Sequence, residues 1–89
     1  MQNDLYRKYH ELACQLRDLT SSPFWPAYLR GLNRTHFGWR YLSDDEHRLW
    51  LELCDSKDPT ERLKGRGYQA GFNQQNPVDL ATFEKELSE

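Results

Sequence analysis

Two histidine–cysteine pairs have the residue types and spacing best suited to metal chemistry. His10 and Cys14 are four residues apart, and His47 and Cys54 are seven apart. Either spacing puts both side chains on one face of a helix, and two histidines with two cysteines can ligate zinc. In the helices expected below, however, the first pair falls opposite the apolar stripe and the second pair falls within an apolar face. We therefore rank a structural zinc-binding domain last among the functions considered, and expect an exposed thiol, a partly buried histidine, and no metal or cofactor.

Other reactive residues do not form a pattern typical of an active site. His10-Glu11 begins like the zinc-protease motif His-Glu-x-x-His, but Cys14 stands where the second histidine belongs. The segment from Lys64 to Gly67 is basic and rich in glycine, but no expected strand precedes it, as a phosphate-binding loop requires. The serines are best explained as caps, turns or terminal residues. We therefore predict that the protein is not an enzyme.

The segment from Ser21 to Leu42 combines aromatic and basic side chains and contains no acidic residue. Arginine, tryptophan and tyrosine dominate the energetics of protein interfaces. A chain of 89 residues buries only roughly 60–65% of its unfolded surface, so its core cannot hide all of the aromatic side chains. Trp25, Leu29 and Leu32 are expected in the core. The residues predicted to contact a protein partner are Tyr28, Arg30, Arg34, Phe37, Trp39, Arg40 and Tyr41. The alternative, which the sequence leaves open, is that the aromatic residues of the loop fold back over the core.

An acidic stretch follows this segment directly and offers a second contact face. Asp44, Asp45 and Glu52 are its predicted contact residues. A protein-binding module of this kind acts sterically and electrostatically, and the roles of adaptor and inhibitor remain equally open. The face of the first helix around Arg7, His10 and Cys14 is a candidate for self-association.

An RNA- or ribosome-associated regulatory protein is the alternative function. Arginines interleaved with aromatic rings supply phosphate contacts and stacking planes. The formal net charge of −2 disfavours this alternative, because affinity for nucleic acid depends on local positive potential. The basic and acidic blocks of so small a chain can instead neutralise each other within the fold.

A short segment of the sequence bears on the RNA- or ribosome-associated alternative. The run RGYQAG, Arg66 to Gly71, resembles a segment of the ribosome modulation factor family, whose members bind ribosomes and hold them inactive. Asn76-Pro77 is loosely similar to the proline-containing turn that follows in that family, although the spacing here is shorter and this chain is acidic where that family is strongly basic. The resemblance implies ribosome association. Close helix packing through Gly67, Ala70 and Gly71 explains the same residues.

Periodicity and capping signals predict an all-α fold, a single domain of four or five short helices over residues 1–89. The first helix should span residues 3–19, with an apolar stripe of Leu5, Tyr9, Leu12, Leu16 and Leu19. Pro26 should open a short second helix, followed by a loop over residues 33–40 that Gly31 and Gly38 favour.

Two further helices carry clear start signals. Ser43 and Glu46 form a capping box for a helix over residues 44–55, whose inward face is expected to contain His47, Leu49, Trp50, Leu53 and Cys54. Asp58-Pro59 should start the next helix. Asn76-Pro77 should start the last one, lined by Leu80, Phe83 and Leu87.

The sequence contains no export signal and no apolar run long enough to cross a bilayer, so we expect no membrane partner. Two cysteines in such a chain are expected to be reduced thiols, which indicates the cytoplasm. The size and the uninterrupted domain are typical of a small bacterial or phage protein.

Overall fold

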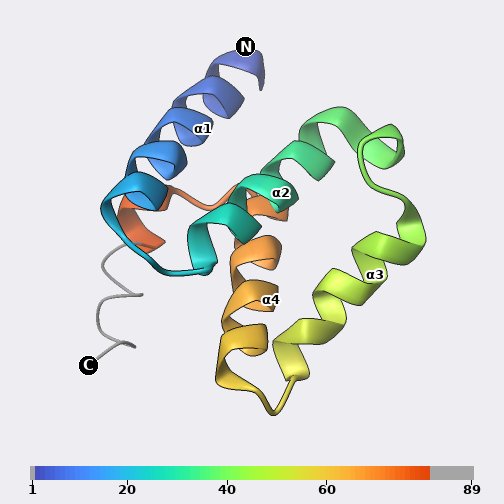
Figure 1. The fold of residues 1–89 in the computed structure, drawn as a ribbon. Helices are drawn as coiled ribbons and strands as arrows, with labels where there is room; N and C mark the ends of the chain where they lie inside the picture. The colour runs from blue at the N-terminus through green and yellow to red at the C-terminus, as the bar shows by residue number, and fades with distance from the viewer. Residues whose placement is uncertain (1, 81–89) are drawn as a thin grey trace.

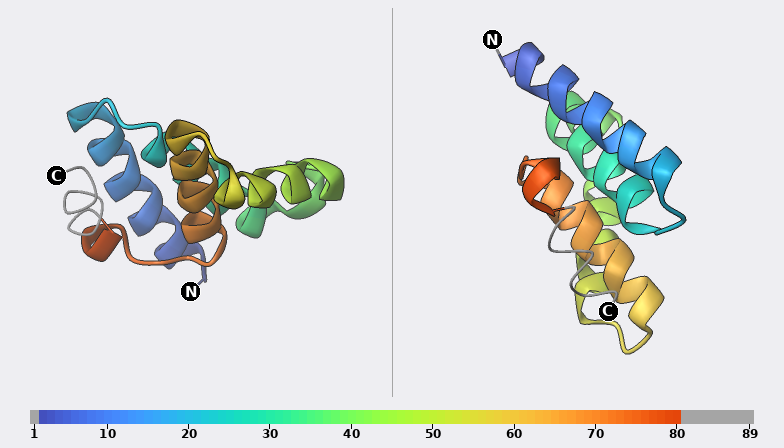
Figure 2. Two further views of the ribbon diagram at one scale, coloured as in Figure 1. Left: turned by 90° about the horizontal axis from the view of Figure 1, so that it is seen from below. Right: turned by 90° about the vertical axis from the view of Figure 1, so that its left-hand side faces the viewer.

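Two helices that cross at glycine residues form the centre of the molecule. The computed structural model describes residues 2–80. Its central pair consists of α2, Phe24–Phe37, and α4, Pro59–Phe72, while α1, Gln2–Leu19, packs mainly on α2 and α3, Asp44–Glu52, packs on α4. Two short 3₁₀ turns, η1 (Gly38–Arg40) and η2 (Leu53–Asp55), follow α2 and α3. The two views in Figure 2 place α1 and α3 at opposite ends, with α2 and α4 between them. The predicted all-α fold is confirmed.

The helix starts expected from the sequence are present as hydrogen bonds. The Ser43 hydroxyl accepts a bond from the Glu46 amide at 3.2 Å, which is the N-cap bond of a capping box, and it donates to the Glu46 carboxylate at 3.3 Å. Asp58 accepts from the Thr60 amide at 2.9 Å, with Pro59 in the first helical position. Asn76 accepts from the Val78 amide at 3.0 Å at the start of a helical turn over residues 77–80. Phe83 and Leu87 lie outside the described residues.

The predicted loop over residues 33–40 is wrong for its first half, because α2 continues to Phe37. Gly31 lies inside this helix, where the backbone of α4 leaves no room for a side chain: a Cβ there would lie within 3 Å of backbone atoms of Tyr68 and Phe72. The Thr35 hydroxyl donates to the Phe72 carbonyl at 2.5 Å and fixes the far end of α2 to α4. Tertiary contacts therefore offset the low helix propensity of Gly31.

Two side-chain clusters surround the α2–α4 contact. The first joins α1, α2 and α4 and is centred on Ala13, Trp25, Tyr28 and Leu32, all fully buried. The second joins α2, α3 and α4 around Tyr68, which is also fully buried. Trp25, Leu29 and Leu32 therefore lie in the core, as predicted.

The buried face of α1 differs from the predicted stripe. Leu5 and Leu19 are exposed, whereas Ala13 is buried and Cys14 packs against the first cluster. At 100° per residue, Ala13 lies about 80° around the helix from Leu5, so the inward face is rotated by that amount. Alanine has no bulk beyond Cβ and lets α1 approach α2 closely, which explains why the face centres there. The Cys14 thiol is half-buried, which corrects the expectation that it faces outward.

On α3 the predicted inward face is also partly wrong. Trp50 is half-buried and its ring stacks on Tyr68, but Leu49 is 61% exposed. The reason is geometric: α3 packs mainly on α4, so only one side of it is covered. None of the described helices is both long and apolar enough to cross a membrane.

Candidate functional site

Three large aromatic side chains are exposed where α2 ends and turns toward α3. Phe37, Trp39 and Tyr41 are 54%, 66% and 39% exposed. Gly38, at φ 80° and ψ −158°, makes the turn, and this conformation is essentially restricted to glycine. We call Phe37, Trp39 and Tyr41 the aromatic corner; it lies at the upper right of Figure 1.

The aromatic corner is supported from behind by α1. The Tyr6 ring stacks on His36 at 4.0 Å between centroids and meets the edge of Phe37 at 5.9 Å. The Tyr6 hydroxyl donates to Asn33 Oδ1 at 2.6 Å, and the Asn33 amide donates to the Tyr41 hydroxyl at 3.4 Å. Burial raises the pKa of Tyr6, so its hydroxyl remains a donor at neutral pH. These contacts hold two of the three exposed rings in place.

A hollow of about 510 Å³ lies beside this support. It is lined by Tyr6, Arg7, His10, Glu11 and His36. Arg7 and His10 were predicted as part of a self-association face, and the structure places both at this hollow. Tyr6, Asn33 and His36 were not predicted as site residues, because the expected loop over residues 33–40 gave no basis for pairing this segment with the first helix.

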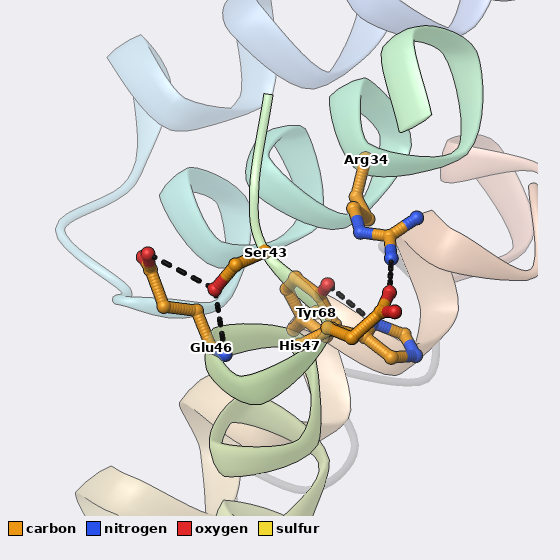
Figure 3. Close-up of polar contacts among 6 residues, drawn as sticks. Arg34, Ser43, Glu46, His47 and Tyr68 are labelled. Carbon is orange, nitrogen blue, oxygen red and sulfur yellow. Dashed lines mark hydrogen bonds and ion pairs between the residues drawn. The ribbon is translucent and has the colours of Figure 1, made fainter. Parts of the chain in front are cut away.

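The three predicted contact arginines do not share one surface. Arg40 lies over the Trp39 ring at 5.6 Å and accompanies the aromatic corner. Arg34 forms an ion pair with Asp44 at 2.6 Å, and its side chain is only 13% exposed (Figure 3). Arg30 lies instead over the Trp50 ring, at 5.7 Å. The predicted surface is therefore divided between different sides of α2.

Tyr28 must be removed from the predicted contact residues. Its side chain is fully buried, and its hydroxyl donates to the Gln75 carbonyl at 2.5 Å. Burial raises the pKa of this hydroxyl. Tyr28 is a core residue because its position on α2 faces α1 and α4, which the sequence could not place relative to one another.

The predicted acidic face is only partly free. Asp44 is occupied by Arg34, whereas Asp45 and Glu52 are exposed on α3. Glu52 borders an apolar groove of about 400 Å³ with Leu49 and Leu53. The acidic residues of α3 therefore accompany exposed leucines, which the sequence had placed inward.

A buried polar contact connects α3 to α4. His47 Nδ1 lies 2.6 Å from the Tyr68 hydroxyl (Figure 3). Burial is the main cause that lowers the pKa of His47, and the nearby Arg34 lowers it further while Asp44 raises it. Burial raises the pKa of Tyr68 to about 12. Both groups are therefore held in their uncharged forms, in which a neutral imidazole and a protonated phenol share this bond.

This contact predicts a loss of stability in acid. A histidine whose folded pKa lies below its unfolded value of about 6.5 binds a proton more readily in the unfolded chain. The free energy of unfolding should be constant above about pH 6.5 and should fall as the pH drops toward the folded pKa. Urea unfolding followed by circular dichroism between pH 7.5 and 5 measures this slope. In His47→Gln the slope should be smaller, and an unchanged slope would assign the acid sensitivity to other groups.

The histidine–cysteine pairs predicted for zinc are not brought together. The Cys14 sulfur lies 3.7 Å from His10 Nδ1 on α1, whereas His47 is bonded to Tyr68 and the Cys54 thiol donates to Gln69 on α4. Within residues 2–80, no group of three or more histidine, cysteine, aspartate or glutamate side chains could hold a metal ion.

Comparison with models of known protein families, with curated proteins and with solved structures finds no match to this chain.

Proposed function

We propose that this protein is a non-enzymatic binding module, an adaptor or inhibitor, that docks its aromatic corner onto a partner protein. The observation that carries the proposal is the exposure of three large aromatic side chains on one turn, between 39% and 66% each. Contiguous apolar patches on a protein surface are usually sites of interaction. Tryptophan and tyrosine in particular supply much of the binding energy of interfaces.

The rigidity of the aromatic corner favours binding. Tyr6, His36 and Asn33 restrain Phe37 and Tyr41 before any partner arrives. Ordering a mobile side chain costs about 0.5–1.5 kcal/mol upon association, and rings that are already fixed avoid part of that cost. Arg40 over Trp39 adds a hydrogen-bond donor at the rim of the same patch.

Nucleic acid is a less suitable partner. Arg34 is neutralised by Asp44, and Arg30 lies over Trp50 away from the exposed rings. Binding to phosphates requires several unneutralised cations on one surface. The proposal assigns the protein to the cytoplasm, where the free thiols of Cys14 and Cys54 would remain reduced.

Trp39→Ala should weaken binding of the partner without changing the fold. A central interface tryptophan contributes 2 kcal/mol or more, which corresponds to roughly a thirtyfold loss of affinity. The wild-type protein and Trp39→Ala are used as baits in cell lysate, with and without nuclease, and bound proteins are identified by mass spectrometry. Circular dichroism checks that the helix content is unchanged.

Leu19→Ala is the matched control, since Leu19 is 80% exposed but lies at the far end of α1. It should retain the partner like the wild type. The proposal is wrong if the same partner binds Trp39→Ala equally well. Recovery of ribosomal or other RNA-bound proteins that disappear with nuclease would support the RNA-associated alternative instead.

A further inference from the structure

A second site lies on the opposite side of α2 from the α1 contact, where α2, α3 and α4 meet. These three helices run as the sides of a triangle in Figure 1. A pocket of about 330 Å³ opens there, a size within the usual range of ligand sites. Its lining residues are Pro23, Pro26, Ala27, Arg30, Trp50 and Lys64.

Arg30 is an exposed residue that lines this pocket beside Trp50. Its guanidinium group lies 5.7 Å from the centre of the Trp50 ring. The Trp50 ring itself stacks on the fully buried Tyr68, at 5.3 Å and 13° between planes. Among the residues that the structure describes, no acidic side chain forms an ion pair with Arg30. Its N–H donors are therefore not neutralised by a carboxylate of the described residues.

The local charge selects a ligand with a single negative charge. Lys64 supplies a second cation, but it is paired with Glu61 at 3.4 Å. Two cations and one carboxylate leave one net positive charge. The start of α2 adds to this potential, since its first turn contains no acidic residue and a helix N-terminus carries partial positive charge. A carboxylate neutralises the pocket, and its planar shape suits the guanidinium fork.

The remaining walls of the pocket are largely apolar. Pro23, Pro26 and Ala27 offer hydrocarbon surface, and the prolines have no N–H to donate. The Trp50 ring packs against both Tyr68 and Arg30, at 5.3 Å and 5.7 Å from its centre. A ligand that fits carries a carboxylate next to an apolar group.

We infer that this pocket binds an acidic peptide, with a carboxylate of the peptide on Arg30 and Lys64 and an apolar neighbour against Pro23 and Pro26. The site is separate from the aromatic corner, and the inference stands whether or not that corner binds a partner.

Titration with a short peptide, followed by ¹H–¹⁵N NMR, tests the inference. The probe is acetyl-Leu-Glu-Leu-amide, and acetyl-Leu-Gln-Leu-amide is its uncharged counterpart. The glutamate peptide should shift the Trp50 indole and Arg30 Nε signals in a saturable way, and the glutamine peptide should bind at least about tenfold more weakly. Equal binding of the two peptides would overturn the inference.

Substitutions inside and outside the pocket test whether the peptide binds there. Arg30→Gln should weaken binding of the glutamate peptide about tenfold or more, and Lys64→Gln should weaken it by a smaller factor and provides a second test if Arg30→Gln disturbs the fold. Arg48→Gln removes an exposed arginine of α3 outside the pocket and should have no effect. Trp39→Ala should also bind the peptide normally, which separates this site from the aromatic corner. Equal losses of peptide affinity in Arg30→Gln and Arg48→Gln would show general charge attraction and contradict the inference. Tighter binding of adenosine monophosphate or inorganic phosphate than of the glutamate peptide would contradict it as well.

Discussion

Replacing Gly71 with alanine should strongly destabilise the protein. A Cβ at this position would lie less than 3 Å from the carbonyl group of Tyr28 and from the amide of Leu32. These are backbone atoms in the middle of α2, so no side chain can rotate away to make room. The two central helices would have to separate, and both buried clusters depend on their contact.

The expected loss of stability from Gly71→Ala is more than about 3 kcal/mol. The total free energy of unfolding of a chain of 89 residues is roughly 4–13 kcal/mol. Thermal unfolding measured by circular dichroism should show a fall in Tm of more than about 12 °C, or no cooperative transition.

Arg66→Ala is the matched control on the same helix. Arg66 is exposed, and alanine is the better helix former there, so stability should change by less than about 0.5 kcal/mol. In a free helix, Gly→Ala gains roughly 1 kcal/mol. A stabilised Gly71→Ala protein would therefore show that α2 and α4 do not approach as closely as the structure has them.

Truncation of Tyr68 to alanine should cost about 3–5 kcal/mol and should loosen α3 first. The fully buried Tyr68 ring stacks on Trp50, and its hydroxyl binds His47; both partners belong to α3. Hydrogen exchange measured by mass spectrometry should show faster exchange over residues 44–55 than over α1.

Tyr68→Phe separates the contribution of the hydroxyl from that of the ring. It leaves the stacking intact and should cost about 1 kcal/mol. The control is Tyr41→Phe, which removes the same atom from an exposed ring and should cost less than about 0.5 kcal/mol. If Tyr68→Ala proved as mild as Tyr41→Phe, Tyr68 would not be the residue that attaches α3.

The helices themselves could be predicted because their signals are local. The capping residues Ser43 and Asp58 act on amides two or three residues away, and the structure contains both hydrogen bonds. Errors arose where a local signal competed with a distant contact. Gly31 was interpreted as a helix breaker, but it is the point at which α4 approaches α2.

The candidate site was predictable only in part, for a related reason. The sequence indicated that some aromatic rings must remain exposed, because a small core cannot cover them all, but it left open whether the rings around the end of α2 cover the core. The structure decided this, since Phe37, Trp39 and Tyr41 are exposed. The sequence could not indicate that Tyr6 and His36 support them, since these residues come from helices whose relative placement no local pattern specifies.

The sequence by itself determined the all-α fold and the helix starts, because periodicity and capping are properties of the chain alone. The tertiary structure alone decided which face of α1 is buried, why Tyr28 lies in the core, and how Arg30, Arg34 and Arg40 are divided among different surfaces. These outcomes depend on the direction from which a neighbouring helix approaches. In this protein the close contacts at Gly31, Gly67 and Gly71 set that direction.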